Sequence, residues 1–237
     1  MTEYEKITAL RQELKRPSVF RHNHIQLRMV LWHLTIRSSA GFKRLMDIIL
    51  AIFAIICGSP VFLLTALLVK LTSPGPIIFS QVRVGRFGRH FKFYKFRSMY
   101  IDAEARKAEL MKHNESGDGV IFKMKHDPRI TPVGRFIRKF SIDELPQLFN
   151  VILGDMSLVG PRPPLPSEVR TYTLEERKRL NITPGITCLW QVSGRSELPF
   201  SKQIALDKEY IASRGVWKDF LILLKTIPAI LTGRGAW

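Results

Sequence analysis

Cysteine is scarce in this chain of 237 residues, which contains only Cys57 and Cys188. One lies in an apolar run and the other in a polar stretch, a spacing that builds neither a disulfide framework nor a zinc knuckle. The first residues also lack the apolar region and small-residue cleavage site of a secretory signal peptide. We therefore expect a domain that faces a reducing, cytoplasmic compartment.

Acidic residues are also few, because 20 Asp and Glu stand against 37 Lys and Arg, for a net charge of +17. Such an excess of positive charge indicates an anionic partner, and both nucleic acid and an anionic membrane surface qualify. The sequence lacks internal repeats and low-complexity segments. The length then favours one medium-sized domain with accessory segments.

A long apolar run over 45–69 contains one charged residue, Asp47. A straight helix of this length would reach about 37 Å, which exceeds a hydrocarbon core of about 30 Å. Ser59 and Pro60 lie near its middle, and proline removes a backbone donor and bends a helix. Both flanks are basic, which the positive-inside rule places on one side. We predict a re-entrant membrane helix over 41–72, broken at Ser59-Pro60; a kinked spanning helix is the alternative.

The remaining segments divide around this helix. Residues 1–40 form a basic, amphipathic N-terminal segment with a helix expected over 4–16. Residues 73–237 form the polar domain, in which two alternating runs around 85–89 predict a β-hairpin. A charged helix follows over 101–113, then a loop at 114–119. Thr173 and Glu176 predict a capped helix. Near the end, the apolar helix over 217–228 is expected either on the membrane or in the core.

The densest chemistry lies at 141–148, where the sequence reads SIDELPQL. Ser141 with Glu144 three residues later is the pattern of a capping box, which predicts a short helix ending at Gly154. Asp143 and Glu144 would lie in its first turn, where free N–H groups and the helix dipole favour ionised carboxylates. An ionised Asp can be a nucleophile, although helix capping alone also explains both acids.

Arginines stand on both sides of this carboxylate pair. Arg138 precedes it and Arg162, in the run GPRP, follows it. Guanidinium groups bind phosphate oxygens in a bidentate geometry and keep their charge. The pattern therefore indicates a phosphate-containing substrate.

The run over 127–163, DPRITPVGRFIRKFSIDELPQLFNVILGDMSLVGPRP, closely resembles the signature of the bacterial sugar transferases, the monotopic polyprenyl-phosphate phosphoglycosyl transferases. The resemblance covers residues 41 to about 232, and includes KFRSM at 95–99, a second signature at 183–195 and the Ser-Pro break. It departs at Cys188, where the family usually has Gly. It implies a membrane-associated α+β fold, mainly helical, with a re-entrant hairpin and a small cytoplasmic catalytic domain.

The resemblance implies an activity: transfer of a phosphosugar from a nucleotide diphosphate sugar, expected to be a UDP-sugar, to polyprenol phosphate, with release of nucleoside monophosphate. This would be the first membrane step of glycan or exopolysaccharide assembly at the bacterial inner membrane. Asp143 is expected as the nucleophile of a covalent intermediate, and Glu144 with Asp143 as ligands of Mg²⁺. The remaining residues expected to bind substrate are Arg138, Arg162, Lys95, Arg97, Asp207 and Asp219.

Two other classes of protein compete with this interpretation. A membrane-anchored nucleic-acid-binding protein would explain the charge, but no nucleic-acid motif or aromatic platform accompanies the basic residues. A structural hairpin protein would explain the apolar segment but not the large polar domain. We expect the sugar nucleotide, polyprenol phosphate and membrane phospholipid as partners, and no nucleic acid. The sequence leaves open the sugar and whether the protein assembles with itself.

Overall fold

The computed structural model describes residues 19–110, 112, 124, 126–233 and 235, so the helix expected at 4–16 and the loop at 114–119 lie outside it. The chain forms two compact units, Met1–Leu45 and Met46–Trp237. The division into 1–40, 41–72 and 73–237 stays a prediction.

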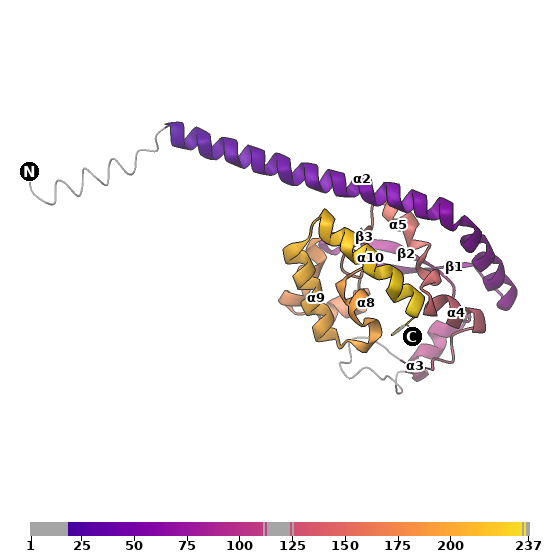
Figure 1. Ribbon diagram of the computed structural model, residues 1–237. Helices are drawn as coiled ribbons and strands as arrows, with labels where there is room; N and C mark the ends of the chain where they lie inside the picture. The colour runs from indigo at the N-terminus through magenta and orange to yellow at the C-terminus, as the bar shows by residue number, and fades with distance from the viewer. Residues whose placement is uncertain (1–18, 111, 113–123, 125, 234, 236–237) are drawn as a thin grey trace, which may run out of the picture. The chain divides into compact units, whose positions relative to one another are not determined.

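The elements are α2 (Val19–Thr72), β1 (Ile78–Val84), β2 (His90–Phe96), α3 (Ala103–Leu110), α4 (Pro132–Lys139), α5 (Gln147–Leu153), β3 (Ser157–Val159), α6 (Pro166–Thr171), α7 (Leu174–Arg177), β4 (Gly185–Thr187), α8 (Leu189–Ser193), α9 (Phe200–Ser213) and α10 (Val216–Thr232), with short 3-10 turns between them (Figure 1).

Helix α2 is continuous, so the predicted break at Ser59 and Pro60 does not interrupt it. Pro60 has no N–H to donate to the carbonyl of Ile56, four residues earlier. The hydroxyl of Ser59 donates to that carbonyl instead, at 2.8 Å. The ribbon of α2 changes direction towards its C-terminal end (Figure 1), as expected for a helix that contains proline. The helix therefore bends without breaking, because Ser59 replaces the lost hydrogen bond.

The stretch Ala40–Thr72 is long and apolar enough to cross a membrane by length and composition, and little of it is buried. Its exposed side chains include Phe53, Ile56, Leu63 and Leu71. An apolar surface of this extent marks a contact with lipid or another apolar partner. The structure is thus a mainly helical α+β domain with one long, exposed apolar helix, which is consistent with association with a membrane.

Two buried polar side chains fix α2 to the rest of its unit. Asp47, the one charge in the apolar run, accepts hydrogen bonds from the hydroxyl of Ser157 at 2.8 Å and from the backbone of Leu158 at 3.3 Å. At the other end, the guanidinium of Arg97 donates to the carbonyls of Ser73 and Pro74, at 2.7 and 2.5 Å. Arg97 also donates to the carbonyl of Val69 at 3.5 Å, one of the last four carbonyls of α2, which have no partner within the helix.

The predicted hairpin is confirmed, since β1 and β2 pair antiparallel with Phe79 opposite Lys95 and Gln81 opposite Phe93. A second, two-stranded sheet pairs β3 with β4 in parallel. Gly185 is required there, because a Cβ atom on it would lie 2.0 Å from the backbone nitrogen of Gly160. The main core lies between these sheets, α5 and α10, and contains Phe93, Val151, Met156, Val159 and Ile222.

Candidate active site

Helix α4 begins where the sequence places polar residues before an apolar face. The hydroxyl of Thr131 accepts a hydrogen bond from the backbone of Gly134 at 2.9 Å and caps the helix. Gly134 lies against the backbone of Ser98, where a Cβ atom would be 1.8 Å from the carbonyl oxygen. This close packing sets the direction of α4 and brings Arg138, in its last turn, to the wall of a cavity.

The capping box predicted at Ser141 and Glu144 is wrong. Ser141 adopts a left-handed conformation, with φ 55°, and its side chain caps nothing. Asp143 and Glu144 lie in a 3-10 turn, Ile142–Glu144, and α5 begins only at Gln147. The two acids therefore precede α5 and do not lie in its first turn. The predicted end of α5 at Gly154 is confirmed, with φ 99°.

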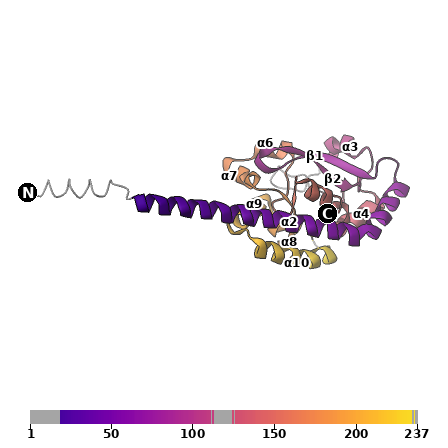
Figure 2. The same cartoon turned by 90° about the horizontal axis from the view of Figure 1, so that it is seen from above.

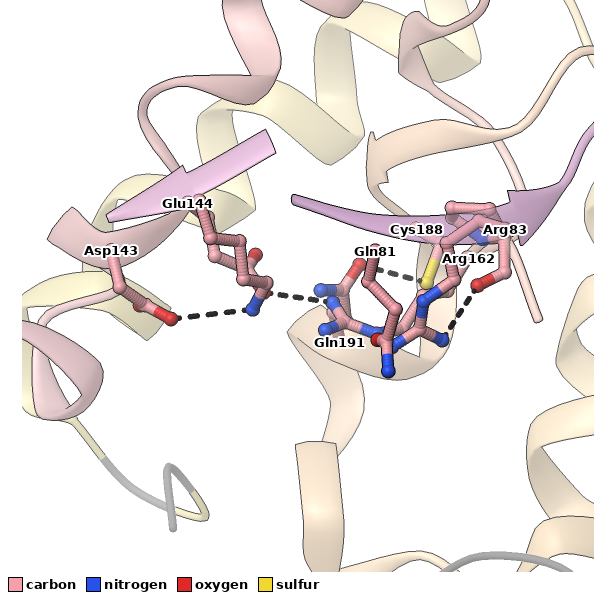
Figure 3. A network of polar contacts seen from close by, with 9 residues as sticks. Gln81, Arg83, Asp143, Glu144, Arg162, Cys188 and Gln191 are labelled. Carbon is pink, nitrogen blue, oxygen red and sulfur yellow. Dashed lines mark hydrogen bonds and ion pairs between the residues drawn. The ribbon is translucent and has the colours of Figure 1, made fainter. Parts of the chain in front are cut away.

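Lysine and arginine hold the two carboxylates instead. The ammonium of Lys95 lies 3.2 Å from Asp143 Oδ2 and 2.7 Å from Glu144 Oε1. The guanidinium of Arg162 donates to the same Oε1 atom at 2.9 Å, and Figure 3 shows Asp143, Glu144 and Arg162 in this network. Lys95 thus bridges both acids, and Glu144 lies between Lys95 and Arg162. Among the residues predicted from the sequence, the structure brings these four together.

The electrostatics of Glu144 follow from these contacts. Burial alone would raise the pKa of the Glu144 carboxyl, but the charges of Arg162 and Lys95 outweigh it and hold that pKa well below its usual range. Burial likewise opposes the charge of Arg162, and Glu144 restores it, so that the pKa of Arg162 is raised. The ionised form of Glu144 is therefore stabilised by two cations, and one of them, Lys95, also contacts Asp143.

Two residues of β1 were missed by the sequence reasoning. Arg83 lies over the ring of Phe93, 5.3 Å from its centroid, and donates to the carbonyl of Pro163 and to Gln81, both at 3.1 Å. Burial and the like charge of Arg162 lower the pKa of Arg83 to about 10. Gln81 and Arg83 alternate along β1 and share a face with Lys95. That alternation was the available signal.

Three predicted residues have other partners. Arg97 holds the end of α2, as described above. Asp207 is fully buried and forms an ion pair of 2.6 Å with Arg179, whose guanidinium also donates to the Tyr172 hydroxyl at 3.1 Å. Asp219 accepts a hydrogen bond of 2.7 Å from the hydroxyl of Tyr210. The structure does not bring these three side chains to Asp143, and their role in substrate binding stays a prediction.

Arg179 connects Asp207 to the site indirectly. It donates to the backbone carbonyl of Arg162 at 3.3 Å and lines the same cavity as Arg162. This cavity has a volume of about 930 Å³, and its wall includes Lys95, Arg138, Asp143, Glu144 and Arg162. Its size is that of a site for a small organic ligand.

The sequence matches a known protein family. A profile described as "Bacterial sugar transferase" matches residues 38–233, most of the chain. The chain belongs to the bacterial sugar transferase family.

Three relatives of this family member illustrate the match. Galactosyl transferase CpsE of Streptococcus agalactiae is 50% identical over 196 residues, which are 82% of this chain and 43% of that protein. Undecaprenyl-phosphate galactose phosphotransferase of Salmonella typhimurium is 43% identical over 227 residues, 92% of this chain and 46% of that protein. Exopolysaccharide production protein ExoY of Sinorhizobium fredii is 40% identical over 198 residues, 82% of this chain and 88% of that protein. The chain spans about half the length of the first two.

Cys188, where this family member departs from the usual glycine, fits its position. Its backbone is extended, with φ −154°, which needs no glycine. Burial raises the pKa of its thiol well above the ordinary value, and the thiol donates to Gln191 Oε1 at 3.1 Å. A buried, protonated thiol is a poor nucleophile. Cys188 is therefore not a candidate nucleophile.

Proposed function

We propose that this sugar transferase moves a phosphosugar from a UDP-sugar to polyprenol phosphate and releases UMP. The observation that carries the proposal is the Asp143 carboxylate held beside Glu144 by Lys95, in a cavity that Arg138 and Arg162 also line. The names of two relatives support this choice of donor and acceptor. One is the undecaprenyl-phosphate galactose phosphotransferase, and another from Aeromonas hydrophila is a UDP-N-acetylgalactosamine-undecaprenyl-phosphate N-acetylgalactosaminephosphotransferase.

The reaction is proposed in two displacements at one phosphorus atom. A carboxylate oxygen of Asp143 attacks the phosphorus that carries the sugar, and the bond from this phosphorus to the bridging oxygen breaks, so UMP leaves with the electron pair. A phosphate oxygen of the polyprenol phosphate then attacks the same phosphorus, and the Asp143 carboxylate is released. Neither step needs a proton, because phosphate or carboxylate is the nucleophile and the leaving group in each.

The side chains of the site have separate roles in this scheme. Arg138 and Arg162 bind the phosphate oxygens, and Lys95 neutralises charge beside the nucleophile. Glu144 fixes Lys95 and Arg162 in place through its hydrogen bonds. Enzymes that transfer phosphoryl groups act mainly through such positioning and charge neutralisation.

Mg²⁺ is the ion that we propose for this site. Within the described part of the chain, no group of three or more His, Cys, Asp or Glu side chains gathers that could hold a metal ion. Asp143 and Glu144 are two adjacent carboxylates, and Mg²⁺ is often bound by one or two carboxylates together with substrate phosphates. We propose that these two residues hold Mg²⁺ with the diphosphate, whose charge it would neutralise.

One assay tests the function. The purified protein is incubated with polyprenol phosphate and a panel of UDP-sugars, including UDP-galactose and UDP-N-acetylgalactosamine, and UMP release is measured. We expect UMP release beyond one equivalent per enzyme with at least one donor, and this multiple turnover only when polyprenol phosphate is present in substrate amounts. Release of free sugar phosphate, or no release with any donor, would contradict the proposal.

Glu144→Gln should lower kcat by about 10- to 100-fold, because the neutral amide oxygen accepts weaker hydrogen bonds from Lys95 and Arg162 than the carboxylate does, and charge-assisted bonds contribute about 1.5–3 kcal/mol each. It should also shift the Mg²⁺ dependence to higher concentration, since one anionic ligand is removed while its shape is kept. Steady-state kinetics across a Mg²⁺ titration measures both effects. Full activity with an unchanged titration would mean that Glu144 neither orders the site nor binds the ion.

The membrane topology is also proposed, with both ends of α2 on the cytoplasmic side of the bacterial inner membrane. Replacing Ser59 with Leu and Pro60 with Ala restores a backbone donor for Ile56 and should straighten the helix enough to span. Single cysteines near residues 5 and 115, in a background without Cys57 and Cys188, report the topology through an impermeant reagent in intact cells. Both should be protected in the wild type, and only the first labelled in the double variant. Labelling near residue 5 with Ser59 and Pro60 intact would exclude the re-entrant form.

A further inference from the structure

The cavity that holds Asp143 has an apolar part as well as a charged one. The charged part is lined by the lysine, the arginines and the acids described above. The wall also contains apolar residues from four elements, namely Ala54 of α2, Leu148 of α5, Val192 of α8 and Ala229 and Ile230 of α10. One continuous cavity therefore joins the reacting carboxylate to a hydrocarbon-lined region.

The elements around this region are the apolar surface helices. Ala51 of α2 and Ile222 of α10 belong to one core cluster; α10 begins near α2 and diverges from it towards its C-terminal end in Figure 1, and it lies on one flank of α2 in Figure 2. Thr226, Ala229 and Ile230 line the cavity from one side of α10. The other side exposes Phe220, Leu224, Ile227 and Leu231.

Ala54 is itself exposed at the surface of α2 although it lines the cavity. The cavity therefore reaches the outside at the apolar stretch of α2, and it does so beside small side chains. A small residue at a cavity wall leaves room for an approaching chain. An apolar opening on an apolar surface suits a ligand that is itself hydrocarbon.

We propose that this apolar part, which we call the prenyl channel, binds the first isoprene units of the acceptor and admits them between α2 and α10. The inference rests on the proposed function. The cavity suits an amphiphile, because its charged part matches an anionic head group and its apolar part matches a hydrocarbon chain. The phosphate would meet Arg138, Arg162 and Lys95, and the remaining chain would stay in the bilayer.

The test uses variants that narrow the prenyl channel, and it measures the donor half-reaction and the acceptor half-reaction separately. Ala229→Trp and Ala54→Trp each add a large ring at its wall. Exchange of radiolabelled UMP into the UDP-sugar that the wild type accepts needs no acceptor and reports the donor step. We expect this exchange to continue, while the KM for polyprenol phosphate rises about tenfold or more, since an overpacked pocket disfavours its ligand.

Each of the two channel variants has a matched control on the same helix. Ile227→Trp and Phe53→Trp place the same ring at exposed sites on the same helices and should keep the acceptor KM of the wild type. Ala66→Trp narrows a second apolar groove, formed with Phe62 and Phe149, and should also have no effect.

Three results would overturn the inference. The first is an unchanged acceptor KM in both Ala229→Trp and Ala54→Trp; the second is a rise in Ala66→Trp alone, which would place the chain in the other groove. The third is loss of UMP exchange in both channel variants while they remain monodisperse in detergent, which would assign this region to the donor. Absence of exchange in the wild type would instead remove the covalent mechanism on which the inference rests.

Discussion

Asp143→Asn should abolish turnover, to below about one per cent of the wild type, because a neutral amide cannot attack phosphorus. The fold should be kept, since the amide oxygen can still accept the hydrogen bond that Lys95 Nζ donates to Oδ2. In the wild type, intact mass spectrometry after mixing with donor but no acceptor should show a phosphosugar adduct. The variant should show none.

The control for this experiment is Asp155→Asn, the same change at a residue that does not line the cavity and lies beside Asn150, 3.4 Å from its amide. It should retain both the adduct and turnover. Deamidation of the introduced amide back to a carboxylate is excluded by peptide mapping. An adduct that forms in Asp143→Asn without deamidation, or turnover comparable to the control, would assign the nucleophile to another group.

Arg179→Met should destabilise the protein by about 3–5 kcal/mol, because it leaves the buried Asp207 carboxylate without the cation that lies 2.6 Å from it. The double variant Arg179→Met/Asp207→Leu should recover most of this loss, since an apolar pair of similar volume carries no uncompensated charge. Denaturant or thermal unfolding in detergent measures all three proteins. A single variant within about 1 kcal/mol of the wild type would show that the pair contributes little.

The loss of stability in Arg179→Met should depend on pH, because Asp207 titrates. Burial raises the pKa of Asp207 to about 6, against the opposing pull of Arg179. An acid with a raised pKa in the folded state favours folding at low pH, and that contribution is lost as pH rises through about 6. Without Arg179 the carboxyl takes up a proton more readily, so the deficit of Arg179→Met should be smaller at pH 5 than at pH 8. An equal deficit at both values would mean that loss of Arg179 leaves the pKa of Asp207 unchanged.

The partners of Glu144 mark where local reasoning failed. The spacing of Ser141 and Glu144 matches a capping box, and the same pattern at Thr173 and Glu176 does form one, at 3.3 Å from Thr173 Oγ1 to the backbone of Glu176. At Glu144 the carboxylate binds Lys95 and Arg162 instead. Both acids are half-buried, but the packing brings the cations Lys95 and Arg162 to Glu144, and these opposite charges replace the local hydrogen bond.

The sequence by itself determined the elements whose causes are local. Alternation along 78–96 produces the hairpin, Gly154 ends α5, and the composition of the apolar run produces the membrane-associated part of α2. Ser59 also lies within reach of the carbonyl that Pro60 leaves unpaired, as its neighbour in sequence must.

The tertiary structure alone decided which charges meet. Lys95 and Glu144 are 49 residues apart, and Arg97 is 24 residues from the Ser73 carbonyl that it binds. Lys95 and Arg97 are close neighbours in KFRSM, yet Lys95 reaches the acids and Arg97 closes the end of α2. A buried charge is satisfied by whichever opposite charge or carbonyl the packing of distant elements brings near, and chain spacing does not encode that choice.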